Sequence, residues 1–251
     1  MAKPRVGLQL IIYGGRPAQD PVGVLREIKQ AGYEGIEGGS PLQLGDDQQA
    51  VKRLISQNGL AVAGVHSGFG DAMSPARTDA NIAYLKEMGA RYLICSGVAE
   101  GEGIERFEKT APVFDEVGRR CKEAGIVFCY HNHNWEFEAF NGVKGIHRLA
   151  ELTDPELVKL CIDVYWVHIG GERPAEFIAR YAKRAPYYHF KDGGPGEFKE
   201  LGQGQVDLKA AVKAALATNP EWIVCEQDRT DKNVAQSITE SRTYMREALG
   251  L

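Results

Sequence analysis

The sequence lacks the features that mark several large classes of protein. Its five cysteines are odd in number and include no CxxC pair, so they do not suggest a disulfide framework. Lys and Arg total 30 against 34 Asp and Glu, a net charge of −4, which argues against a dedicated nucleic-acid binder. No segment approaches the roughly 20 consecutive apolar residues that a membrane-spanning helix needs. We therefore expect a protein that binds neither nucleic acid nor membrane.

Several short motifs are missing as well. The first 17 residues hold only a brief apolar stretch before Gly14, without the cleavage site of a signal peptide, so we expect a reduced, cytoplasmic protein. No P-loop or dinucleotide fingerprint is present, and no nucleotide cofactor is implied. There is no GxSxG segment to indicate a serine nucleophile.

What the sequence does contain is a repeated junction. Gly32, Gly59, Gly89 and Gly125 each follow an amphipathic stretch and precede a short apolar run, as expected where a helix turns into a strand. Eight such apolar runs are predicted strands, at 6–12, 33–37, 60–66, 92–96, 126–131, 157–163, 187–190 and 222–226. The clearest predicted helices are 46–57, 75–88, 104–123, 174–183, 207–217 and 233–249.

The number of predicted strands and the length favour one α/β domain over residues 1–251, a (β/α)8 TIM barrel. An open, doubly wound sheet remains the alternative, because the pattern of elements does not establish closure.

Polar residues gather where the predicted strands end. These residues are Glu37, His66, His131, His133, Asp163, His189, Lys191 and Glu226. Because the carboxyl ends of barrel strands meet at one face, this pattern predicts a catalytic or metal site there. Two or three carboxylates with an imidazole favour one divalent ion, Mn²⁺, Mg²⁺ or Co²⁺, with Zn²⁺ as an alternative. Such an ion would stabilise an enediolate, while a neighbouring Glu, His or Lys moves the proton.

Five segments, taken in order, resemble a known family. They are 130–137 (YHNHNWEF), 163–166 (DVYW), 189–192 (HFKD), 201–207 (LGQGQVD) and 225–228 (CEQD). The set is similar to the sugar phosphate isomerase/epimerase family of the xylose-isomerase-like barrels, with tagatose epimerase, hydroxypyruvate isomerase and inosose dehydratase as relatives. The resemblance implies a metal-dependent sugar isomerase or epimerase, with Mn²⁺ favoured, that assembles as a dimer or tetramer.

The resemblance also implies roles for single residues. Asp163, His189 and Glu226 become metal ligands, and Glu226 also moves protons. The family's strand-five glutamate has no direct match, because His131 stands at its place and Glu136 follows a few residues later. Either Glu136 reaches the metal and acts in catalysis, which we favour, or a histidine replaces the carboxylate. His131 and His133 are then expected to contact the substrate or to move protons.

Other candidates have both functional and structural interpretations. Lys191 is expected to neutralise an oxyanion and Asp192 to orient His189, although the two could form a solvated pair at the strand end. Glu37 and His66 are expected to bind sugar hydroxyls. Trp166 could stack on a sugar or pack in the core. Arg229 could contact an anionic group or face solvent.

Three functions therefore stay open. The first is isomerisation or epimerisation of a ketose or keto-sugar through an enediolate. Displacement of the strand-five glutamate makes a symmetric two-base reaction less assured and favours the second, a dehydratase or lyase of a keto-inositol or 3-keto-sugar. The third, of another class, is a non-catalytic sugar-binding or accessory barrel.

Overall fold

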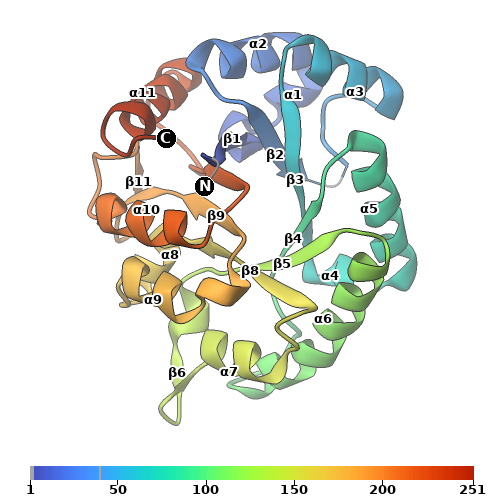
Figure 1. Cartoon of the computed structure of the whole chain (residues 1–251), viewed down its shortest axis with the longest axis vertical. Helices are drawn as coiled ribbons and strands as arrows, with labels where there is room; N and C mark the ends of the chain where they lie inside the picture. The colour runs from blue at the N-terminus through green and yellow to red at the C-terminus, as the bar shows by residue number, and fades with distance from the viewer. Residues whose placement is uncertain (1–2, 40) are drawn as a thin grey trace.

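The computed structural model describes residues 3–39 and 41–251. Eight parallel strands form a closed barrel, and helices surround it (Figure 1). In order around the barrel the strands are β1 (Arg5–Gln9), β2 (Gly35–Gly39), β3 (Ala61–Gly68), β4 (Tyr92–Ser96), β5 (Val127–His131), β8 (Val158–Asp163), β9 (Tyr187–Phe190) and β12 (Trp222–Cys225), which pairs with β1 again. The predicted barrel is thus confirmed, and the open sheet is excluded.

The helices follow the strands along the chain. They are α1 (Arg16–Gln19), α2 (Pro21–Ala31), α3 (Gln48–Gln57), α4 (Phe69–Ala72), α5 (Pro75–Met88), α6 (Glu105–Glu123), α7 (Gly145–Leu152), α8 (Val164–Ile169), α9 (Pro174–Arg180), α10 (Leu208–Ala217) and α11 (Val234–Glu247). Helix α5 begins where the Ser74 hydroxyl accepts a hydrogen bond from the Arg77 amide, and it ends at Gly89 with φ 72°. Over the described residues, no helix combines the length and apolar character needed to cross a membrane.

In two places a 3₁₀ turn cuts a predicted element short. The run at 6–12 stops being a strand at Gln9, because the Gln9 side chain accepts the Ile11 amide and starts a 3₁₀ helix, η1 (Leu10–Tyr13). The helix predicted at 174–183 ends at Arg180, and a second 3₁₀ turn, η3 (Ala182–Arg184), follows it.

Two small hairpins and one further 3₁₀ turn were not predicted. The first hairpin pairs β6 (Ala139–Phe140) with β7 (Val143–Lys144), and the second pairs β10 (Asp192–Gly194) with β11 (Glu197–Lys199). The additional turn is η2 (Trp135–Phe137).

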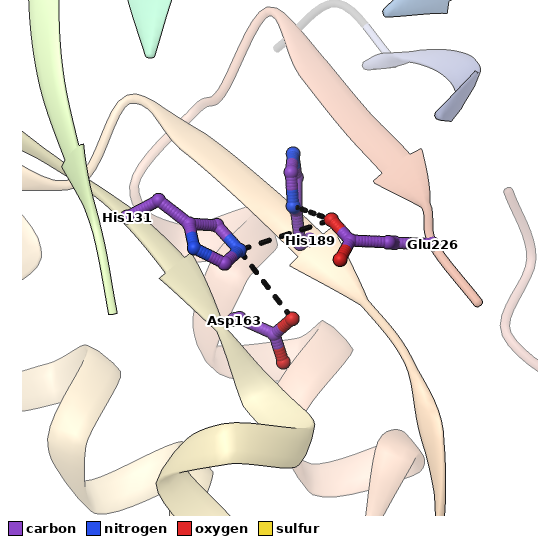
Figure 2. Close-up of side chains that lie close together, drawn as sticks. All are labelled: His131, Asp163, His189 and Glu226. Carbon is purple, nitrogen blue, oxygen red and sulfur yellow. Dashed lines mark ion pairs between the residues drawn. The ribbon is translucent and has the colours of Figure 1, made fainter. Parts of the chain in front are cut away.

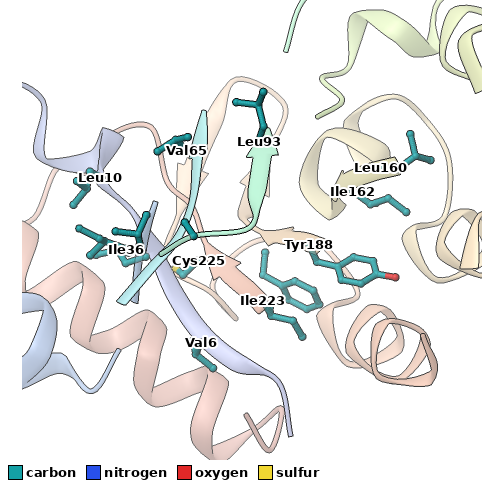
Figure 3. Packing of buried hydrophobic residues seen from close by; sticks show 14 of the residues in the cluster. Val6, Leu10, Ile36, Val65, Leu93, Leu160, Ile162, Tyr188, Ile223 and Cys225 are labelled. Atoms are coloured by element: carbon teal, nitrogen blue, oxygen red, sulfur yellow. The ribbon is translucent and has the colours of Figure 1, made fainter. Parts of the chain in front are cut away.

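Side chains on the outer face of the strands pack against the helices. Figure 3 shows part of this cluster, with Val6, Ile36, Leu93 and Ile162 among its labelled residues. Each fully buried aliphatic or aromatic side chain contributes about 2 kcal/mol of transfer free energy, so this layer is the main source of stability. This layer holds the barrel strands in place from outside, and it does not include the side chains on their inner face.

The inner face carries a second, smaller apolar cluster. Its members are Ala63, Tyr92, Ile94, Cys129, Cys161, Tyr187, Trp222 and Val224. Gly35 makes room for one of the largest of them, because a β-carbon there would lie 2.5 Å from the Trp222 ring. The interior of the barrel is therefore filled with apolar side chains up to the level at which the polar strand ends begin.

Candidate metal centre and pocket

The polar residues at the strand ends continue the inward side of each strand. Side chains alternate along a strand, so a residue two positions after an inward one also points inward. Four inward apolar residues are followed in this way by an ionisable one: Cys129 by His131, Cys161 by Asp163, Tyr187 by His189 and Val224 by Glu226. Residues from three strand ends and the residue just after β12 therefore converge directly above the apolar interior.

The four side chains form one compact cluster (Figure 2). One nitrogen or oxygen atom from each lies within 4.8 Å of the corresponding atoms of the other three. His131 Nε2 is 3.5 Å from Asp163 Oδ2 and 3.8 Å from Glu226 Oε2. His189 Nδ1 contacts the same oxygen of Glu226. All four residues are buried.

The atoms that face one another make no hydrogen bond in this arrangement. They are His131 Nε2, Asp163 Oδ2, His189 Nδ1 and Glu226 Oε2. His189 Nδ1 and Glu226 Oε2 are paired only as ions. A buried polar atom left without a partner costs about 1–3 kcal/mol, so four in one place call for a common partner. Two imidazole nitrogens and two carboxylate oxygens suit Mn²⁺, Co²⁺ or Zn²⁺ and, less well, Mg²⁺. The residues therefore fit a divalent ion.

The opposite atoms of three of these side chains are held in place by the protein. Asp163 Oδ1 accepts the amides of Tyr165 and Trp166 at 2.9 and 3.1 Å. Glu226 Oε1 accepts Lys191 Nζ at 2.9 Å. His189 Nε2 lies 2.8 Å from Glu37 Oε2. Each of the three thus has one atom fixed by the fold and one atom directed into the cluster.

The electrostatics of the cluster follow from its burial and its cations. Burial raises the pKa of Asp163 to about 6, with repulsion from Glu226 adding to the effect and attraction to Lys191 opposing it. Burial opposes ionisation of Glu226 too, but attraction to Lys191 and His189 outweighs it and places the pKa well below its usual value. Burial and the charge of His189 hold the pKa of His131 well below its usual value. Burial opposes protonation of His189, but Cys161, Glu37 and Glu226 outweigh it and raise the pKa of His189 well above its usual value. His131 and Glu226 are therefore ready to bind an ion, whereas His189 would have to give up its Nδ1 proton to do so.

Lys191 is buried beside the cluster instead of forming a solvated pair with Asp192. Its Nζ contacts Glu226 and Asp228, and it lies 4.8 Å from the centre of the Trp166 ring. Burial alone would lower the pKa of Lys191, but Glu226, Asp163 and Asp228 raise it above its usual value. Lys191 therefore carries a positive charge that balances these carboxylates.

Glu136, the fourth ligand favoured from the sequence, lies outside this cluster. The His133 amide donates a hydrogen bond to both of its oxygens, at 2.9 and 2.8 Å. The Tyr130 hydroxyl donates another to Oε1 at 2.7 Å. The carboxylate is turned onto its own loop by the 3₁₀ turn η2, which follows β5. His131, the alternative ligand left open by the sequence, lies in the cluster instead.

A pocket of about 430 Å³ opens above the cluster. Four of the predicted site residues line it: His66, His131, His133 and Glu226. Trp166 is half-buried against Lys191 and Phe198. Arg229 is exposed, with Nη2 donating to the Gly196 carbonyl at 3.2 Å. Glu37, Trp166, Lys191 and Arg229 are not among the residues described as lining this pocket.

The pocket wall also includes polar residues that the sequence analysis did not select. Ser96 and Asp228 are two of them. Ser96 follows the alternation noted above, since it comes two residues after the inward Ile94, and that periodicity could have found it. Asp228 lies in the loop past the end of β12, where strand alternation gives no signal.

Asp192 does not contact His189 through any described hydrogen bond; it organises the loop that follows β9. Its carboxylate accepts the amides of Gly193, Gly202, Gly204 and Val206 at 2.9–3.1 Å. The glycine-rich segment is thereby folded back onto the end of β9. A β-carbon at Gly204 would lie 2.2 Å from the Asp192 carboxylate, which explains the glycine there.

The model of the xylose isomerase-like TIM barrel family matches residues 25–248. The chain belongs to this family. Inosose dehydratase from Geobacillus kaustophilus is 28% identical to this xylose isomerase-like barrel over 78% of the chain and 70% of the relative.

Solved structures with the same fold include a sugar phosphate isomerase/epimerase from Parabacteroides distasonis. It has a TM-score of 0.86 and 22% identity, and the match covers 99% of this barrel and 95% of that chain. An L-ribulose 3-epimerase has a TM-score of 0.75 and 18% identity, covering 99% and 95%. At these identities the two structures show a shared fold.

Proposed function

We propose that this barrel is a divalent-metal-dependent dehydratase that acts on a keto-inositol or keto-sugar by removing a proton beside the carbonyl group. The proposal depends on one observation above all: four buried atoms without hydrogen-bond partners converge below a polar pocket. The ligands would be His131, Asp163, His189 and Glu226. The likeness to inosose dehydratase supports the substrate class.

The chain's own residues suggest how the reaction is divided. A bound divalent ion would polarise the substrate carbonyl and stabilise the negative charge that develops when the neighbouring proton leaves. His133 and Asp228 lie on the pocket wall, where an imidazole nitrogen and a carboxylate oxygen can exchange protons with a sugar. Lys191 donates a hydrogen bond to Glu226 and contacts Asp228, so its positive charge lies between these two side chains.

The placement of Glu136 favours dehydration over a symmetric epimerisation. The carboxylates that line the pocket are Glu226, whose oxygens face Lys191 and the cluster, and Asp228. The proton-transfer groups nearby are therefore chemically unlike: imidazoles and one aspartate. Elimination of water needs one group to take a proton and a different one to protonate the departing hydroxyl, and unlike groups suit these two tasks.

Epimerisation, the first expectation from the sequence, is kept as a second candidate because of two histidines. His66 and His133 both line the pocket, and their ring centres lie 5.1 and 5.0 Å from that of His131. Two imidazoles flanking one centre could serve as the two bases that inversion of a stereocentre requires.

One experiment separates these functions. The Mn²⁺-loaded protein is incubated in D₂O with a 2-keto-inositol and, separately, with a ketose, and the products are followed by mass spectrometry and NMR. We expect loss of one water from the keto-inositol. Deuterium uptake with inversion and no loss of water would show epimerisation instead.

The Asp163→Asn variant, treated in the same way, is the control for contaminating enzymes. If neither reaction occurs with any keto-sugar, and the protein also binds no divalent ion, the enzyme proposal fails. The non-catalytic sugar-binding or accessory barrel then takes its place.

A further inference from the structure

Glu37 is completely buried at the inner face of β2, below the pocket wall. Its Oε2 accepts the Tyr187 hydroxyl at 2.8 Å and lies 2.8 Å from His189 Nε2. Its Oε1 lies 3.2 Å from His66 Nδ1. Both oxygens are thus engaged by protein groups, which differs from the sugar-binding role expected from the sequence.

The contact between Glu37 and His189 crosses the barrel. Strands β2 and β9 are not neighbours, because β1 and β12 lie between them. A buried carboxylate from a strand that is not adjacent to β9 therefore lies directly against one of the proposed metal ligands.

We propose that Glu37 is a positioning residue that fixes His189 for metal binding. An imidazole that donates its Nε2 proton to a carboxylate keeps a lone pair on Nδ1 and cannot rotate without losing that bond. His189 Nδ1 is the atom that faces the cluster. Glu37 sets both the tautomer and the ring orientation that ligation through Nδ1 needs. This inference rests on the proposed metal-dependent function.

The same carboxylate also orders the pocket wall. His66 contacts Glu37 through Nδ1 and Ser96 Oγ through Nε2, the latter at 3.0 Å. Glu37 thus joins the ion cluster to a pocket residue through one side chain. Replacing His66 leaves the bond between Glu37 and His189 in place. A His66 variant therefore separates the contact of Glu37 with the pocket wall from its contact with the ion cluster.

The test measures Mn²⁺ affinity, by the EPR signal of free Mn²⁺, for the wild type and for Glu37→Gln, Tyr187→Phe and His66→Ala. Removing a carboxylate that supports a ligating histidine weakens metal binding by about 10- to 100-fold, and this is the loss expected for Glu37→Gln. Tyr187→Phe removes one hydrogen bond to the same oxygen but leaves its charge, and should weaken binding about threefold. His66→Ala removes one contact to the other oxygen of Glu37 but keeps the bond between Glu37 and His189, and should weaken binding less than Glu37→Gln does.

Kinetics separate positioning from sugar binding. With Mn²⁺ at saturating concentration, Glu37→Gln is expected to keep a KM near that of the wild type. If Glu37→Gln binds Mn²⁺ as tightly as the wild type does but has a raised KM, the inference is overturned and Glu37 returns to a sugar-binding role. Circular dichroism checks folding. If Glu37→Gln does not fold, unchanged Mn²⁺ affinity in Tyr187→Phe overturns it instead.

A wild-type protein that binds no divalent ion is a separate outcome. That result removes the proposed function itself, and with it any ligand for Glu37 to position. It is distinguishable from failure of this inference, in which the wild type binds Mn²⁺ and the Glu37 variant binds it equally well.

Discussion

The floor of the pocket and the loops around it both contain buried carboxylates, but these differ in what their oxygens contact. On the floor, Asp163 and Glu226 each have one oxygen engaged and one without a hydrogen-bond partner. In the loops, Glu136 and Asp192 have both oxygens occupied by amide or hydroxyl donors. Burial is nearly the same in the two places, so burial does not distinguish a candidate ligand from a structural carboxylate. What distinguishes them is a carboxylate oxygen that has no hydrogen-bond partner.

The largest expected effect comes from Asp163→Asn. The amide keeps an acceptor for the Tyr165 and Trp166 amides but removes the charged oxygen that faces the cluster. We expect bound metal to disappear and kcat/KM to fall by more than about 100-fold, beyond the loss from an outer contact. Elemental analysis and steady-state kinetics check this.

Thermal stability provides the control for that variant. One of two mutually repelling carboxylates has been neutralised, so the apparent Tm without metal should stay level or rise. Stoichiometric metal in Asp163→Asn would contradict the ligand assignment.

Asp192→Ala should act on stability and leave the floor intact. Four amide donors lose a charged acceptor, and we expect the free energy of unfolding to fall by about 3 kcal/mol. Urea denaturation measures the loss, and Asp192→Asn, which keeps one acceptor oxygen, should lose less. An unchanged unfolding midpoint would show that the loop does not need this carboxylate.

Glu136→Gln has the smallest expected effect and bears directly on the sequence-based ligand. The amide oxygen can still accept the His133 amide, so the loss in stability should be about 1 kcal/mol. We expect Mn²⁺ affinity to match that of the wild type. Tyr130→Phe, which removes the other donor to this carboxylate, is the paired control. If Glu136→Gln loses its metal, Glu136 returns as the ligand in place of His131.

Much of this arrangement could be predicted from the sequence, because it follows from alternation along single strands. The barrel was predicted from its repeated junctions, and His131, Asp163, His189 and Glu226 were all selected as residues of the strand ends. The same alternation favours His131 over Glu136, since His131 comes two residues after the inward Cys129. The preference for Glu136 came from the family resemblance and not from the strand pattern.

Other contacts join residues that no local pattern connects. Asp192 receives amides from a loop 10 to 14 residues further on, and that requires the β10–β11 hairpin to fold back. Glu37 reaches His189 across 152 residues of sequence and two intervening strands. Such partners depend on the tilt and closure of the whole barrel, which a single sequence without its fold does not specify.

The apolar filling of the barrel limits the directions from which a ligand can reach the pocket. Trp222, Tyr187, Tyr92 and Ile94 fill the interior below the cluster, so the pocket does not continue through the barrel. A ligand can therefore approach the cluster, and depart from it, only on the side of the barrel where the strands end and the loops begin.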